Sequence, residues 1–383
     1  MGFVRPLSVE TPMNQTGTSP SRGDFARYFL RLGALGFGGP IALVGHMHRE
    51  LVEARGWITE DEYREGMALA QLSPGPLAAQ LCFYIGYIRG GIAGSALSGL
   101  AFVLPSFVMV VALGWAYVQY GGLPWMQAVF YGVGAAVIGL ISRSAYGLTR
   151  KTIGTDLLFW SVFLVVAVGT AVTGREPVLL VLAGGALVWV VRTPPAILRR
   201  RGTLAEAGSA ILLLQILGFF TYAGSFVFGS GLAIVPFLHG GVVLGHHWLT
   251  ERQFLDAVAV ALITPGPVVI TTGFIGYLVA GFAGACIAAG ATFLPSFLFT
   301  VIPAPYFHRY GKRPGLASVV AGITAGATGA IAGAVIVLGR QSLVDSTTVL
   351  IAAGAFGLTW LKWKVPEPLI VVAAALIGLA VRS

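Results

Sequence analysis

Long apolar segments, separated by short polar or basic joints, dominate this sequence. A helix needs about 20 apolar residues to cross a bilayer, and several of the segments reach that length. Only 10% of the 383 residues are charged and the mean hydropathy is +0.83, whereas a soluble domain carries about 25% charged residues. Soluble enzymes, nucleic-acid binders and secreted disulfide scaffolds are therefore excluded. The pattern predicts an all-α polytopic membrane protein.

Six segments precede a basic joint and six follow it. They run roughly over 25–45, 67–87, 92–120, 125–147, 157–172, 178–191, 211–238, 254–279, 282–302, 316–338, 348–360 and 368–381. The net charge of +9 has two explanations, which charge alone cannot separate. Basic loops orient membrane proteins, and a basic protein also suits an anionic substrate.

The second half of the chain repeats the first. The motif Trp57-Ile58-Thr59-Glu60 returns 191 residues later as Trp248-Leu249-Thr250-Glu251. The same shift maps Pro74-Gly75-Pro76 onto Pro265-Gly266-Pro267, and a shift of 190 maps Leu104–Phe107 onto Leu294–Phe297. Chance similarity between glycine-rich helices would not keep these motifs in order. We therefore expect a disordered tail at 1–23, a first repeat at 24–192, a basic linker at 193–209 and a second repeat at 210–383.

Loop charges indicate that the two repeats are inverted. After the third segment the first half is uncharged, whereas the second half carries Arg309, Lys312 and Arg313. After the fourth segment the bias reverses, with Arg143, Arg150 and Lys151 against Arg340 alone. Cytoplasmic loops carry excess Lys and Arg, so the linker is expected to be cytoplasmic. Inversion needs an odd number of crossings per half. We expect about ten transmembrane helices plus two re-entrant or broken elements.

The two Pro-Gly-Pro motifs are the natural places for these broken elements. Proline removes a backbone donor and clashes with the preceding turn, so no continuous helix passes through the motif. A half-helix beginning there points unpaired amides and the positive end of its dipole inward, which is suited to an anion. The alternative is a simple kink between packed helices. The candidate substrate-binding residues are Gln71, Ser73, Pro74, Gly75, Pro76 and Gln80, with Thr264, Pro265, Gly266, Pro267, Thr271 and Thr272.

Glycine clusters interrupt the first segment of each half and are a second candidate pair of breaks. Glycine permits close backbone approach, although small residues also serve ordinary helix packing. The candidate residues are Phe37, Gly38, Gly39, Gly229 and Ser230.

Few charged residues lie near the apolar segments. Anion attraction or proton coupling is one reading of them, and interfacial or helix-end placement is the simpler one. The candidates are Arg27, Arg31, His48, Glu65 and Asp256. No metalloprotease, serine-hydrolase or phosphate-loop motif occurs. We expect no cofactor, no metal site and no enzyme activity, and any active transport has to be secondary.

The chain resembles the chromate ion transporter family in its long form, with two fused homologous domains. The resemblance covers roughly residues 25–383. It is carried by Phe37-Gly38-Gly39-Pro40, His48, Trp57, Gln71, Pro74-Gly75-Pro76, Gln80, Gly86, Gly90-Gly91, Gly94 and Phe102-Val103-Leu104-Pro105. The second half departs from the pattern, with Ser230-Gly231 in place of Gly39-Pro40 and Leu262 in place of Gln71. The two half-sites are therefore not expected to be equivalent.

The resemblance implies export of chromate across the bacterial inner membrane, which gives chromate resistance. Sulfate has the same shape and charge, so an exchanger of sulfate or another oxyanion is an alternative, as is a channel. An intramembrane enzyme is an alternative of another class, but no catalytic pair supports it. The expected partners are the oxyanion and the lipid bilayer, without nucleic acid, and a homodimer is left open.

Overall fold

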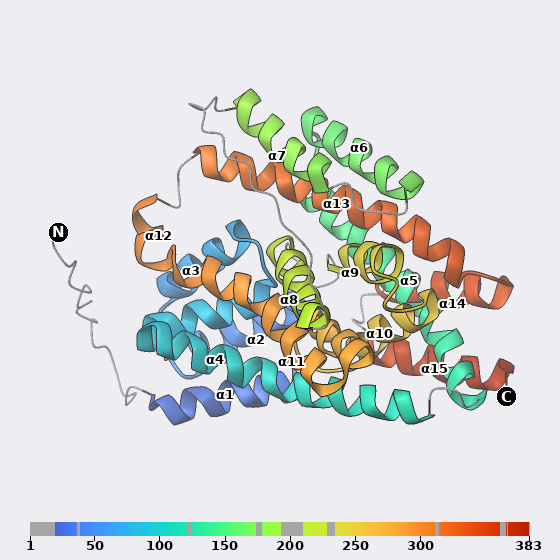
Figure 1. Cartoon of the computed structure of the whole chain (residues 1–383). Helices are drawn as coiled ribbons and strands as arrows, with labels where there is room; N and C mark the ends of the chain where they lie inside the picture. The colour runs from blue at the N-terminus through green and yellow to red at the C-terminus, as the bar shows by residue number, and fades with distance from the viewer. Residues whose placement is uncertain are drawn as a thin grey trace.

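The computed structural model describes residues 20–36, 39–120, 124–173, 178–192, 210–227, 234–310, 314–360, 365 and 367–382 (Figure 1). Within these ranges the protein is helical and contains no strand, so the all-α prediction is confirmed. Residues 1–19 of the expected tail, the linker 193–209, and Phe37, Gly38, Gly229 and Ser230 lie outside the described residues.

Each helix of the first half has an equivalent in the second. The first half contains α1 (Arg22–Leu35), α2 (Gly39–Met47), η1 (His48–Ala54), α3 (Glu60–Leu72), α4 (Leu77–Tyr120), α5 (Pro124–Thr152), α6 (Leu157–Thr173) and α7 (Val178–Arg192). The second contains α8 (Ala210–Ser225), α9 (Ile234–Leu238), η3 (His239–Gly245), α10 (Glu251–Ile263), η4 (Val268–Ile270), α11 (Thr271–Val301), α12 (Ala304–Tyr310), α13 (Pro314–Ser342), α14 (Ser346–Leu358) and α15 (Glu367–Arg382).

Both Pro-Gly-Pro motifs interrupt their helices, as the sequence predicted. In the first half α3 ends at Leu72 and α4 begins at Leu77. The Cα of Gly66 in α3 faces the ring of Tyr84 in α4 so closely that a Cβ at Gly66 would collide with it. Residues 66 and 84 lie on either side of the break, so the two helices must fold back on each other. Residues 74–76 are the tip of this hairpin, and residues 265–267 are the tip of the equivalent hairpin formed by α10 and α11.

A repeated cap fixes where each hairpin starts. The Thr59 side chain accepts a hydrogen bond from the Glu62 amide, and the Glu62 carboxylate accepts one from the Thr59 amide. Thr250 and Gln253 form the same reciprocal pair at the start of α10. This capping box satisfies two amides that the first turn of a helix leaves open. It explains why the threonine recurs in the duplicated motif.

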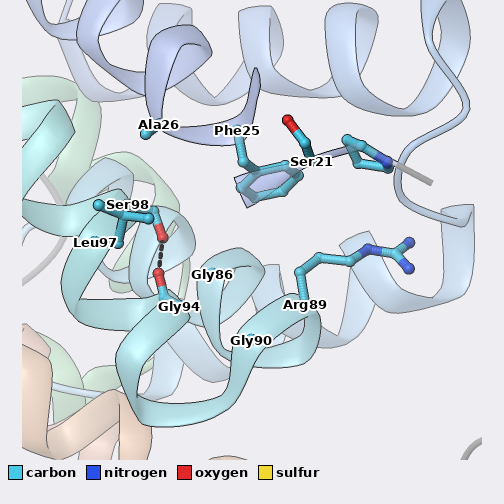
Figure 2. Close-up of a pocket in the computed structure, with 10 residues that line it drawn as sticks. Ser21, Phe25, Ala26, Gly86, Arg89, Gly90, Gly94, Leu97 and Ser98 are labelled. Atoms are coloured by element: carbon cyan, nitrogen blue, oxygen red, sulfur yellow. Dashed lines mark hydrogen bonds between the residues drawn. The ribbon is translucent and has the colours of Figure 1, made fainter. Parts of the chain in front are cut away.

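The helix α4 is itself two arms, joined by a sharp turn. The backbone leaves helical geometry at Gly90 and Gly91, and the arms 77–89 and 92–120 then pack side by side. Gly86 on the first arm lies against the carbonyl of Gly94 on the second, and Figure 2 shows both residues beside the turn. The same turn occurs in α11 at Ala280-Gly281. Among the described residues, the helices that are long and apolar enough to cross a membrane are α4, α5, α11 and α13.

The first apolar segment of each half, 25–45 and 211–238, is not one crossing helix, which agrees with a break near the glycine cluster rather than with an uninterrupted packing helix. The helix α1 ends at Leu35, and the chain returns through α2 and η1. The ring of Trp57 consequently stacks on Phe25, 5.6 Å away between centroids, at the start of α1. In the second half Trp248 lies against Phe219 and Phe220 in the same way. Besides the turn within α4 or α11, each half thus has two breaks, one beside its glycine cluster and one at its Pro-Gly-Pro tip.

The halves are interleaved rather than side by side. The helix α5 packs against α14 and α15 of the second half, and α13 packs against α6 and α7 of the first. Gly139 in α5 lies against the carbonyl of Ala352, and its equivalent Gly329 lies against the carbonyl of Phe163. Small residues let helix backbones approach closely in membrane proteins. Figure 1 shows the second arm of α4 and that of α11 crossing the view in opposite directions.

This packing predicts that Gly139→Ala destabilises the protein. A Cβ at position 139 would collide with the backbone of α14, whereas at Gly134 on the same helix nothing lies within 4 Å. Overpacking typically costs about 1–3 kcal/mol, so Gly139→Ala is expected to lower the melting temperature in detergent by several degrees. Gly134→Ala is the matched control and should melt like the parent. Equal melting of both variants would contradict the interleaved arrangement.

Candidate functional site

The four breaks of the chain meet in pairs. The amide of Gly75, at the first Pro-Gly-Pro tip, donates to the carbonyl of Val227 in the other half, at 2.5 Å. The amide of Gly266, at the second tip, donates to the carbonyl of Gly36 at 2.9 Å. Gly36 immediately precedes the first glycine cluster and Val227 immediately precedes the second. Each tip is therefore held against the glycine-containing break of the opposite half.

Glycine is required at both tips. The φ angles are +147° at Gly75 and +99° at Gly266, a region that side chains with a Cβ rarely adopt. A Cβ at Gly75 would also lie 2.6 Å from the Gln80 Nε2 and 2.7 Å from the Ser296 Oγ. A Cβ at Gly266 would collide with the Ser106 Oγ. The close approach of these polar groups depends on the missing side chain.

Two polar atoms at the first tip are buried without a partner in the described part of the chain. They are the Gln80 Oε1 and the Ser296 Oγ, and both side chains are 0% exposed. The side-chain Nε2 of Gln80 donates to the Pro74 carbonyl at 2.7 Å. Buried polar atoms are almost always hydrogen-bonded, so an unpaired cluster of this kind indicates a place for a polar ligand.

Helix starts add donors beside the same tips. The helix α4 begins at Leu77, directly after the first tip, and η4 begins at Val268, directly after the second. The first amides of a helix have no intrahelical partner, and the dipole there favours negative charge. None of the residues at the tips is Lys or Arg. Dipoles and neutral donors, rather than full charges, thus shape this region.

The predicted threonine donors behave differently from the expectation. The hydroxyl of Thr264 donates to the Val260 carbonyl at 2.7 Å. Thr271 and Thr272 donate to the carbonyls of Val268 and Val269. Their hydrogens are thereby used within their own turns, and the prediction that they offer free donors is corrected. Helical threonines commonly return their hydroxyl to the preceding turn, which the sequence alone does not reveal.

The remaining tip candidates differ in burial. Ser73 is buried and donates to the Phe299 carbonyl at 3.2 Å, which ties the first tip to α11. Gln71 is exposed on α3, whereas its repeat equivalent Leu262 is buried.

Ser106 and Ser296 are not among the site residues predicted from the sequence. Ser296 lies at the first tip as described, and Ser106 donates to the Gly33 carbonyl near the second, at 3.3 Å. Both belong to the duplicated Leu-Pro-Ser-Phe motif, which the analysis used only as a marker of the repeat. A polar residue kept at the same place in both copies was the signal available.

The charged candidates lie away from the tips or in fixed pairs. Arg27 and Arg31 are exposed on α1, and Arg27 approaches Asp24 at 3.9 Å. His48 lies 2.8 Å from Glu60, and the equivalent His239 lies 2.6 Å from Glu251. These two pairs join η1 to the start of α3 and η3 to the start of α10. The hydrogen bond with His48 holds the pKa of the Glu60 carboxyl below its usual value.

Glu65 and Asp256 are equivalent acids with different surroundings. Glu65 is half-buried on α3. Asp256 is buried on α10 and accepts a hydrogen bond from the Tyr117 hydroxyl at 2.6 Å.

A shallow hollow at the turn of α4 is separate from the tips. It is lined by residues of α1 and α4 that include Ser21, Phe25 and Arg89 (Figure 2). The Arg89 guanidinium donates to the Trp57 carbonyl and to Glu62. None of the predicted site residues lines this hollow. In the described ranges no cluster of His, Cys, Asp and Glu could hold a metal ion.

The His48–Glu60 pair predicts a pH-dependent contribution to stability. Because the pKa of Glu60 is lowered in the folded protein, its contribution is present above the usual carboxyl pKa and is lost as the pH falls through the lowered value. Glu60→Gln should reduce the melting temperature at pH 7 and have a smaller effect at a pH below the usual carboxyl pKa. Asp61→Asn, a change of an exposed neighbour, is the control. An equal effect of Glu60→Gln at both pH values would contradict the pairing.

Two segments of the chain, residues 23–189 and 214–379, match the family described as chromate transporter. A probable chromate transport protein of Synechococcus elongatus is 62% identical over 92% of this chain and 93% of its own. A chromate transport protein of Cupriavidus metallidurans is 60% identical over 92% and 91%. One from Pseudomonas aeruginosa is 31% identical over the same shares. No solved structure matches the chain.

Proposed function

The chain belongs to the chromate transporter family, and on that premise we propose that it carries chromate across the membrane through the site formed by the two Pro-Gly-Pro tips. It is a membrane transport protein and not an enzyme, in keeping with its relatives. The single observation that supports the tips as the site is the unpaired, fully buried Ser296 hydroxyl beside Gly75 and Gln80.

The chemistry of chromate suits this site. Chromate is a tetrahedral oxyanion, which accepts hydrogen bonds from backbone amides, hydroxyls and amide side chains. Ser296 supplies a free hydroxyl, and rotation of the Gln80 amide supplies either an acceptor or two donors. The helix starts at Leu77 and Val268 add positive potential. An isolated Lys or Arg at this depth would hold a dianion strongly, so a site built from dipoles favours release.

The direction and the energy source belong to the same proposal. The sequence contains no nucleotide-binding motif, so transport is secondary and is coupled to protons or to the membrane potential. We propose export across the bacterial inner membrane by two repeats, at 24–192 and 210–383, of opposite orientation. The alternating loop charges support this orientation, as do the opposite directions of the second arms of α4 and α11 in Figure 1.

Substitution of the tip glycines tests the site. Gly75→Ala and Gly266→Ala each place a Cβ in a strained backbone conformation, which costs about 1–3 kcal/mol and displaces the polar groups around it. Chromate uptake into everted vesicles is expected to fall about tenfold or more, with normal amounts of inserted protein. Gly290→Ala, at an open position of α11, should transport normally. Unchanged uptake in both tip variants would remove the case for this site.

The two equivalent serines give a sharper comparison. Ser296 is unpaired, whereas the Ser106 hydroxyl already donates to Gly33. A hydrogen bond to a charged group contributes about 1.5–3 kcal/mol, so Ser296→Ala should raise the KM for chromate about tenfold. Ser106→Ala should change KM less, and competing sulfate is added to test selectivity. Equal KM values for Ser296→Ala and the parent would exclude Ser296 from the site.

A further inference from the structure

The pseudo-symmetry of the two halves is broken at the second hairpin. The helix α10 packs against α5 and α15 of the interleaved helices. Its equivalent α3 has α4, α12 and η1 as its main neighbours, and packs on neither α13 nor α7 to a comparable extent. The hairpin that contains α10 is therefore closed against the body of the protein, and the hairpin that contains α3 is open.

Exposure follows the same division. Asp256, Val258 and Leu262 on α10 are 4%, 0% and 4% exposed. Their equivalents on α3 are Glu65 and Met67, which are half-buried, and Gln71, which is exposed. An inverted repeat reaches its second access state when the two halves exchange conformations. In that state α10 would be the exposed hairpin.

One bond crosses between the repeats on the closed side. The Tyr117 hydroxyl, on the second arm of α4, donates to the Asp256 carboxyl at 2.6 Å. On the open side the residues equivalent to Tyr117 and Asp256 are Phe307 and Glu65. Phenylalanine cannot donate a hydrogen bond, so position 307 gives no such bond between the repeats, and Glu65 instead accepts a hydrogen bond from the Tyr84 hydroxyl of its own half. The connection is specific to the α10 side.

No cation compensates Asp256 in the described part of the chain. It forms no ion pair there, and besides Tyr117 the charged group acting on it is Arg252, one turn earlier on α10. Arg252 is exposed and donates to Gln127 at 3.4 Å. On the packed helices α5 and α15 and on η3, several titratable and charged groups have partners other than Asp256. The pairs are His239 with Glu251, Tyr131 with Asp345, Arg382 with the Tyr131 ring, and Arg143 with the Trp360 ring.

We propose that Asp256 is a proton-binding site whose protonation closes the α10 side of the transporter. An ionised carboxylate buried without a cation is costly, and a proton taken from water converts it to a neutral acid that the closed site tolerates. Loss of that proton favours the state in which α10 leaves α5 and Asp256 meets water. By linkage, low pH closes this side and high pH opens it. The inference rests on the proposed function only in taking the protein as a transporter with two access states.

We call this proton-dependent closure of the α10 side the gate. Labelling of a cysteine on α10 tests it without any substrate. Leu262→Cys is introduced into a Cys286→Ser background, and the purified protein in liposomes is treated with a water-soluble maleimide between pH 5.5 and pH 8.5. Each rate is divided by that of the unfolded protein at the same pH, which removes the pH dependence of the thiol. The protein without Leu262→Cys corrects for the buried Cys82. The normalised rate is expected to rise at least threefold from low to high pH.

Three variants separate the proposal from a purely structural role. Asp256→Asn imitates the protonated acid and should keep the rate low at every pH. Tyr117→Phe removes the bond that stabilises the ionised form in the closed state, so the rate should stay low at pH 5.5 and exceed that of the parent at pH 8.5. Glu65→Gln, on the other hairpin, should leave the curve unchanged. A rise that survives in Asp256→Asn, or is absent in the parent, would overturn the proposal. Should Asp256→Asn not fold, a labelling rate at pH 8.5 that is no higher in Tyr117→Phe than in the parent would overturn it alone.

Transport distinguishes this inference from the proposed function. Chromate uptake by the parent should vary with pH, and in Asp256→Asn the variation should be lost while the KM for chromate is retained. If the parent moves no chromate at any pH but the labelling behaves as described, the substrate assignment fails and the gate stands. If chromate is transported with the same pH profile in the parent and in Asp256→Asn, the gate fails and the substrate assignment stands.

Discussion

Two hydrogen bonds between the halves fix the centre of this protein. They run from the amide of Gly75 to the Val227 carbonyl and from the amide of Gly266 to the Gly36 carbonyl. Backbone polar groups at membrane depth must be satisfied by protein or by water, and a hairpin tip cannot satisfy its own. Each half therefore uses the break of the other half as a partner. Neither tip can be formed by one repeat alone, which accounts for the interleaving of α5 and α13 with the opposite half.

This constraint also explains the composition of the site. Because the amides of Gly75 and Gly266 are already used, the tips do not offer them to a ligand, and other donors have to do so. In the site that we propose, the buried Ser296 hydroxyl, the Gln80 side chain and the starts of α4 and η4 fill this role. The absence of a Cβ at the tip glycines gives these groups their close approach. Asp256 and Tyr117 act at a distance from the tips, where the closed hairpin meets the body.

Much of this arrangement could be predicted from the sequence because it depends on local chemistry. Prolines on both sides of a glycine end a helix, and Thr59 with Glu62 starts one, whatever surrounds them. Other features depend on contacts between distant residues. The glycine cluster in the apolar run 25–45 indicated a break, but the return of η1 onto α1 is fixed by Trp57 packing on Phe25, which the run does not reveal. The hydroxyls of Thr264, Thr271 and Thr272 donate to backbone carbonyls of their own turns. The unequal burial of Gln71 and Leu262 arises only from the packing of α10.

The position of the bound anion is the most direct test of the account, and chromium provides its own signal. Anomalous diffraction from crystals soaked in chromate should give one chromium peak at the tips, within hydrogen-bonding reach of the Ser296 Oγ and the Gln80 side chain. That peak should weaken in Ser296→Ala. A chromium peak only in the hollow beside Arg89, or none in crystals of protein that transports chromate, would contradict it.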